Sequence, residues 1–201
     1  MKDFRMGWAA AGLGLLAVTG SLALGCGSDS STKEPGKGMH NEDEVGAEDR
    51  ERIERGLELS PVPVNLDGLD RNLVGLGSYI VNAQGACTDC HTNPPYAPGG
   101  NPFLGEPEQA NTEHFLAGGT RFGPEIVAPN ITPNEEGLPA GLRYEQFLNL
   151  LRTGREEDGD ILQVMPWPIY GKMREQDLRA IYEYLRAIPR AEPGTAPAPV
   201  P

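Results

Sequence analysis

The sequence predicts an all-α domain of three or more helices joined by long Gly/Pro-rich loops, and three observations support this fold class. Three stretches place apolar residues at the three- and four-residue spacing of a helix. The 201 residues include 26 Gly and 19 Pro, which favour irregular connections over long regular elements. Aromatic residues make up only 6%, so a core of ordinary density would need additional apolar material, such as a large cofactor.

The first helix is expected over about 71–84, with Asp70 available to cap its start. The second carries an apolar stripe from residue 144 to 151, and Gly154 is well placed to end it. The third is expected over about 175–188, where a proline follows. Small residues on the first and third helices predict that the two cross closely: Gly75, Gly77 and Ala180, with Tyr184 beside them.

The first 25 residues predict an export signal of the lipoprotein type. Lys2 and Arg5 give a basic start, and residues 7–25 form an uncharged, largely apolar run that ends directly before Cys26. Small residues before a cysteine resemble a bacterial lipoprotein cleavage site, which predicts lipidation of Cys26. Two alternatives stay open: the run is long enough for an uncleaved transmembrane anchor, and simple secretion is the third reading.

Three further segments follow from composition. Residues 26–65 are rich in acidic and small polar side chains and predict a flexible, disordered tether, in which a short solvated helix is possible. Residues 66–190 form the expected folded domain. Residues 191–201 are a Pro-rich tail, expected to be extended.

The charge of the chain limits its partners. The formal net charge is −12, which excludes nucleic acid, because phosphate requires clustered Lys and Arg. Residues 1–25 carry a net charge of +1 and residues 27–60 a net charge of −5, which leaves −8 on residues 61–201, so the expected domain is itself acidic. A protein partner should therefore present a basic or neutral docking face.

Cys87-Thr88-Asp89-Cys90-His91 is the most informative segment of the chain. Two thiols three residues apart, followed at once by a histidine, form the attachment motif of a c-type haem. Each sulfur adds to one vinyl group, and His91 becomes the proximal iron ligand. The motif therefore predicts one covalently attached haem c, held by Cys87, Cys90 and His91.

Three other readings of these residues stay open. A dithiol redox centre would use both thiols but give His91 no role. A zinc site would need a fourth ligand and usually a second Cys or His pair. A structural disulfide between Cys87 and Cys90 is the third.

Met165 is the expected second axial ligand of the iron. Thioether ligation raises the reduction potential relative to two imidazoles. Met165 lies in Val164-Met165-Pro166-Trp167-Pro168, where two prolines stiffen a non-helical segment. Met173 competes for this role but is also suited to a hydrophobic staple at the start of the third helix, and His114 is the main non-thioether alternative.

Several segments resemble class I c-type cytochromes, and more narrowly the cytochrome subunits of membrane-bound bacterial dehydrogenases. They are Tyr79-Ile80-Val81 through His91, Ala128 to Pro133, Leu151-Arg152-Thr153-Gly154, Met165-Pro166-Trp167 through Tyr170, and Asp177-Leu178 to Tyr184-Leu185. The resemblance covers about 70–190. It implies an all-α, cytochrome c-like haem fold with His91 and Met165 as iron ligands.

Side chains near these motifs are candidates to bind the haem propionates, since buried carboxylates need hydrogen-bond donors. Asn130 and Thr132 are two, and Trp167 could offer its indole N–H. The other reading of residues 130–133 is a turn that uses Asn and Pro for backbone geometry. Arg121 and Arg152 are further candidates.

The sequence thus predicts a monohaem cytochrome that transfers single electrons and is itself no enzyme. Its expected place is the periplasmic side of a bacterial membrane, and its expected partners are redox proteins such as a dehydrogenase, an oxidase or another cytochrome. The alternative is a haem-based peroxidase, or a gas or redox sensor, with a labile distal ligand.

Overall fold

The computed structural model describes residues 46–194. The predicted signal segment, Cys26 and the tether up to residue 45 lie outside the described residues, as does the tail from residue 195. The described part is mostly helical, as the sequence predicts. Its elements are α1 (Ala47–Leu59), α2 (Arg71–Tyr79), the π-helical turn η1 (Ile80–Gln84), α3 (Cys87–His91), the 3₁₀ turn η2 (Pro102–Leu104), β1 (Arg121–Phe122), β2 (Ile126–Val127), α4 (Tyr144–Thr153), α5 (Trp167–Tyr170) and α6 (Glu175–Ala187).

The first predicted helix is present as α2 and its continuation η1. Asp70 caps it, because its carboxylate accepts hydrogen bonds from the backbone N–H groups of Asn72 (2.8 Å) and Leu73 (3.4 Å). The turn η1 then delivers the chain to α3, which carries the Cys-X-X-Cys-His motif. The predicted helix before the haem motif is therefore confirmed.

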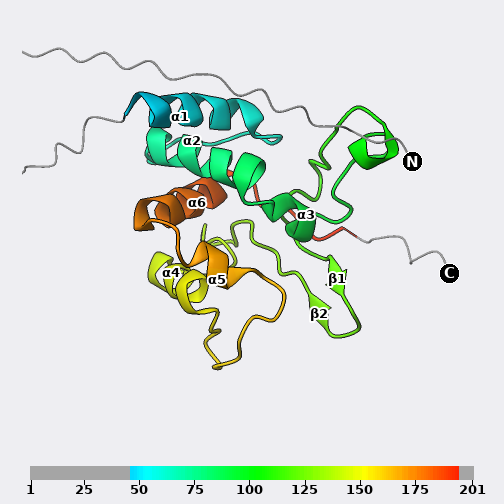
Figure 1. The fold of residues 1–201 in the computed structure, drawn as a ribbon, viewed down its shortest axis with the longest axis vertical. Helices are drawn as coiled ribbons and strands as arrows, with labels where there is room; N and C mark the ends of the chain where they lie inside the picture. Colours follow the sequence, from blue (N-terminus) through cyan, green and yellow to red (C-terminus); the bar gives the residue numbers. More distant parts are fainter. Residues whose placement is uncertain (1–45, 195–201) are drawn as a thin grey trace, which may run out of the picture. The chain divides into compact units, whose positions relative to one another are not determined.

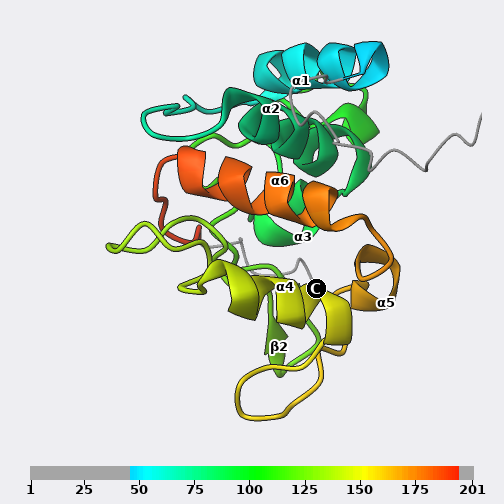
Figure 2. The same cartoon turned by 90° about the vertical axis from the view of Figure 1, so that its left-hand side faces the viewer.

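The helices pack in the order α1, α2, α6, α4, and the contacts between them join each neighbouring pair (Figure 2). The core between α2 and α6 is built of aliphatic side chains and one tyrosine, with Leu76, Ile80, Leu178, Tyr184 and Leu185 at most 2% exposed. Burial of each such aliphatic side chain stabilises the fold by about 1.5–3 kcal/mol.

Gly77 makes the close crossing of α2 and α6 possible. A Cβ atom at this position would collide with the backbone carbonyl of Ala180 and lie 2.8 Å from the Cβ of Tyr184. Only a residue without a side chain permits this approach, so the predicted crossing is confirmed at Gly77, Ala180 and Tyr184. Gly75 instead lies against Ile53 of α1, so its predicted part in this crossing is wrong.

Helix α1 differs from the sequence prediction, which placed residues up to 65 in a flexible tether. Ile53 is 3% exposed and belongs to the same core cluster as α2 and α6. Gly56 lies so close to α2 that a Cβ there would collide with the carbonyl oxygen of Gly75. The folded unit therefore includes α1. The acidic composition of this stretch predicts a tether and gives no sign of this packing.

The second half of the chain surrounds the far side of α6. Gly154 ends α4 with φ = 66°, the left-handed conformation that glycine adopts without strain, as predicted. Strands β1 and β2 form an antiparallel hairpin that pairs Arg121 with Val127 and Phe122 with Ile126 (Figure 1). Within residues 46–194, no helix is long and apolar enough to cross a membrane.

Candidate functional site

A cavity of about 730 Å³ lies between the haem motif and the second half of the chain. Its volume falls in the range of about 300–1,000 Å³ that ligand and cofactor pockets have. Cys87, Cys90 and His91 line it on one side and Met165 on another, and most other lining side chains are apolar. The structure therefore brings four predicted haem residues, far apart in the sequence, to one cavity.

Cys87 and Cys90 are both free thiols in α3. Burial raises the pKa of Cys87 to about 12, and burial also raises the pKa of Cys90. Reactive redox cysteines instead have a lowered pKa, because the thiolate is the nucleophile. The setting of these thiols is thus unlike that of a dithiol redox centre.

His91 is held by a single backbone oxygen. Its Nδ1 lies 2.9 Å from the carbonyl oxygen of Pro129, and because a carbonyl only accepts, Nδ1 carries the proton and donates. Burial lowers the pKa of His91 and keeps the ring neutral. The Nε2 lone pair is then free to bind a metal, an arrangement in which the second ring nitrogen fixes the tautomer and orientation of the ligand.

Two methionines line the cavity, Met165 and Met173, and both are half-buried. Met165 precedes α5, where Trp167 N–H donates to its carbonyl oxygen at 2.8 Å. The carbonyl of Met173 accepts from Arg152 Nη1 at 2.8 Å. That Met165 is the axial ligand, and Met173 is not, stays a prediction.

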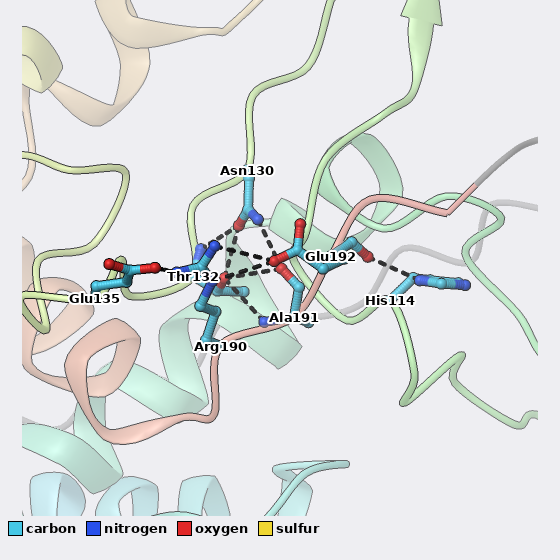
Figure 3. A network of polar contacts seen from close by, with 7 residues as sticks. All are labelled: His114, Asn130, Thr132, Glu135, Arg190, Ala191 and Glu192. Carbon is cyan, nitrogen blue, oxygen red and sulfur yellow. Dashed lines mark hydrogen bonds and ion pairs between the residues drawn. The ribbon is translucent and has the colours of Figure 1, made fainter.

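Asn130 and Thr132 do not line the cavity. Asn130 Oδ1 accepts from the backbone N–H of Thr132 (2.8 Å) and from its hydroxyl (2.7 Å), and Asn130 Nδ2 donates to the carbonyl of Ala191 at 2.7 Å (Figure 3). Their polar atoms thus have partners within the chain, in the geometry of a turn. The structure supplies no support for the predicted propionate contacts of these two residues.

The remaining propionate candidates also lie off the cavity wall. The indole N–H of Trp167 donates to the carbonyl of Leu162 at 3.2 Å, and its ring covers Gly154. Arg152 donates to the carbonyls of Gly171 and Met173, which ties α4 to the chain after α5. Arg121 lies exposed on β1.

His114, the non-thioether alternative, is not among the residues that line the cavity either. Its Nδ1 donates to the carbonyl of Glu192 at 2.8 Å.

Carboxylates occupy the exposed edge of the cavity. Glu125 lies in the turn between β1 and β2, and Glu156 and Asp160 lie in a second tight turn, where Arg155 pairs with Ile161. Ile161 and three other apolar residues of this edge are partly exposed as well, at 37–43%: Ile126, Val127 and Val164.

Two contributors to the site are absent from the sequence prediction. The Pro129 carbonyl is a backbone group, and no side-chain pattern identifies which carbonyl will face a histidine. Tyr170 lines the cavity and donates from its hydroxyl to the Gly85 carbonyl at 2.6 Å. Tyr170 ends the segment from Met165 that carries the family resemblance, but the sequence predicts no role for it.

The chain is similar to parts of three longer known proteins. The chain is 33% identical over 113 residues to the gluconate 2-dehydrogenase cytochrome c subunit of Pantoea cypripedii, which covers 56% of this chain and 22% of that one. It is 29% identical over 133 residues to the fructose dehydrogenase cytochrome subunit of Gluconobacter japonicus (64% and 24%). It is 30% identical over 116 residues to the cytochrome c subunit of a quinone alcohol dehydrogenase of Gluconobacter oxydans (57% and 21%).

The chain therefore spans about a fifth to a quarter of the length of these relatives. No protein-family model matches it. All three relatives are cytochrome subunits of dehydrogenases, and the resemblance to that class of proteins, which the sequence predicts, is confirmed over this part of their length.

Proposed function

We propose that the chain is a monohaem c-type cytochrome that carries single electrons between periplasmic or membrane-associated redox proteins, as the electron-accepting subunit of a dehydrogenase. The meeting of Cys87, Cys90, His91 and Met165 in one cavity carries this proposal. The relatives support it, since each is named as a cytochrome subunit of a dehydrogenase. The chain itself then makes and breaks no substrate bonds.

The residues of the cavity fit a haem c by their chemistry. Cys87 and Cys90 would form the two thioether bonds, and the neutral His91 ring would bind through Nε2. One Cys-X-X-Cys-His motif is present, so the proposal has one haem. The haem iron supplies reversible one-electron chemistry. The protein supplies the ligands and an apolar surrounding that excludes water and tunes the reduction potential.

The other readings of the motif have less support. The raised pKa of Cys87 argues against a dithiol redox centre. A zinc site would need a fourth ligand and usually a second Cys or His pair. The three relatives described above do not support the peroxidase or sensor alternative, because each is named as a cytochrome subunit of a dehydrogenase.

The partner should bind where the carboxylates surround the cavity. Glu125, Glu156 and Asp160 lie at its edge, and the lining residues include no Lys or Arg. A partner with a basic or neutral docking face would approach this edge without repulsion. The lipid anchor proposed at Cys26 would keep the protein on the periplasmic side of the membrane, near such a partner.

An optical spectrum of the purified, oxidised protein tests the proposal. A weak near-infrared Met-to-iron band is expected, and Met165→Ala should abolish it and lower the reduction potential while the haem stays covalently bound. Met173→Ala is the matched control, because this second thioether lines the same cavity. A high-spin ferric spectrum of the wild type would reject the carrier. Loss of the band only in Met173→Ala would reassign the ligand.

Covalent attachment is tested separately. Cys87→Ala with Cys90→Ala should release the haem under denaturing conditions, whereas wild-type protein should keep its pigment on a denaturing gel. Pigment retained by the double variant would overturn the attachment argument.

A further inference from the structure

The chain that follows α6 crosses the loops on the His91 side of the cavity. We define the C-terminal strap as residues 190–194. Asn130 Nδ2 donates to the Ala191 carbonyl at 2.7 Å, and the Ala191 N–H donates to Thr132 Oγ1 at 3.2 Å (Figure 3). His114 Nδ1 donates to the Glu192 carbonyl at 2.8 Å. The strap is thus bonded through its backbone to two different loops.

One of these loops supplies the carbonyl that holds His91. Asn130 directly follows Pro129, so the Asn130 side chain fixes both the turn and the position of the carbonyl before it. Its Oδ1 accepts from the N–H and the hydroxyl of Thr132 while its Nδ2 holds the strap. Thr132 is 3% exposed, so its hydroxyl is buried. A buried hydroxyl without a hydrogen-bond partner costs free energy, which favours both of its bonds.

The far end of the strap contacts the segment that carries His91 itself. Gly194 lies against Asn93, two residues after His91, so closely that a Cβ on Gly194 would collide with the Asn93 carbonyl. The same Cβ would lie 2.7 Å from Cδ2 of His114. The strap therefore touches both segments that the His91–Pro129 hydrogen bond joins.

We propose that the C-terminal strap is a positioning element that holds the Pro129 carbonyl against His91 Nδ1, with Asn130 and Thr132 as its positioning residues. A hydrogen bond at the second ring nitrogen raises the basicity of a histidine ligand, and a more basic ligand favours the oxidised iron. The strap then keeps the reduction potential low from outside the cavity. This inference rests on the proposed haem site.

Two truncations of the full chain test the role of the strap. A chain that ends at Arg190 loses residues 191–194, which make all of these backbone bonds, whereas a chain that ends at Gly194 keeps them and also ends in a new terminal carboxylate. In the reduced protein, the chain that ends at Arg190 should exchange the His91 Nδ1 proton with solvent about tenfold faster than the full chain, the factor expected for one lost hydrogen bond. Its reduction potential should also be higher than that of the full chain. The second should match the full chain in both measurements.

A pair of point variants decides the matter if the shorter chain does not fold. Thr132→Val removes the hydroxyl that accepts from the Ala191 N–H and donates to Asn130 Oδ1, and Thr132→Ser restores both bonds. Faster Nδ1 exchange and a raised potential in Thr132→Val, with both restored in Thr132→Ser, support the strap. Lower stability with unchanged exchange and potential would overturn the inference and leave the strap a purely structural contact. Failure of the haem proposal would look different, because the full chain would then carry no covalent haem.

Discussion

The hydroxyl of Tyr170 donates a 2.6 Å hydrogen bond to the backbone carbonyl of Gly85. This bond joins α5, which follows Met165, to the turn that leads into Cys87. Burial raises the pKa of Tyr170 to about 12, so its hydroxyl stays protonated and remains a donor at neutral pH. One tyrosine therefore ties the two sides of the cavity together.

Tyr170→Phe should loosen that connection. Loss of one hydroxyl-to-carbonyl hydrogen bond should lower the free energy of unfolding by about 1 kcal/mol, measured by urea denaturation. The Met-to-iron band should also weaken, because the segment that carries Met165 loses its anchor. Tyr182→Phe is the matched control: it loses a 2.9 Å bond to the carbonyl of Leu142, which also lines the cavity but is not attached to the Met165 segment, so it should lose similar stability but keep the band. Equal bands in both variants would contradict the prediction.

Gly77→Ala should separate α2 from α6. Alanine favours a helix over glycine by about 1 kcal/mol, but its Cβ would collide with the Ala180 carbonyl. Overpacking of this kind costs about 1–3 kcal/mol or more, which exceeds the gain in helix propensity. The net effect of the substitution should therefore be a lower free energy of unfolding. Gly46→Ala, at the N-cap of α1 with nothing within 4 Å of the added Cβ, should cost less than about 1 kcal/mol, for the weaker cap alone. A stabilised Gly77→Ala protein would show that the helices can separate without loss.

The helices around the cavity could be predicted because their signals are local. Asp70 caps α2 and Gly154 ends α4 through interactions within a few residues, and the apolar stripes follow the helical period. The proximity of the Cys-X-X-Cys-His motif to Met165 could also be predicted, because His91 and Met165 are both expected to bind the same haem iron. These features depend on residue type and spacing, which a single sequence contains.

The rest depends on backbone groups and on distant partners. Asn130 and Thr132 have the donors that a propionate needs, but the same donors satisfy a turn and the strap, and residue type does not distinguish these partners. The acidic composition of residues 47–59 predicts a tether, although the burial of Ile53 and the close approach of Gly56 attach this helix to α2. Both features become visible only when the chain is folded.

Ile53→Ala tests whether α1 belongs to the folded unit. Ile53 is 3% exposed, so truncation should cost about 2–5 kcal/mol of unfolding free energy, measured by thermal or urea denaturation. Leu104→Ala is the control, since Leu104 is 74% exposed and its loss should cost less than about 0.5 kcal/mol. If both variants had wild-type stability, residues 47–59 would be a tether, as their composition suggests.

The ion pair between Glu54 and Arg71 should make the contact of α1 with α2 sensitive to acid. Both carboxylate oxygens of Glu54 accept from Arg71 at 2.8 Å, and this hydrogen bonding holds the pKa of Glu54 below its ordinary value of 4.5. A lowered folded-state pKa means that the unfolded chain takes up the proton first as the pH falls. The contribution of the ion pair to stability is therefore complete above pH 4.5 and is lost as the pH falls through the folded-state pKa.

Glu54→Gln should therefore be less stable than the wild type at pH 7, and the difference in stability should shrink toward zero in acid. Glu136→Gln removes the same charge from an exposed loop and is the control for the loss of one negative charge. A stability difference for Glu54→Gln that stays constant from pH 7 to acid would assign the contact to neutral hydrogen bonding instead of charge.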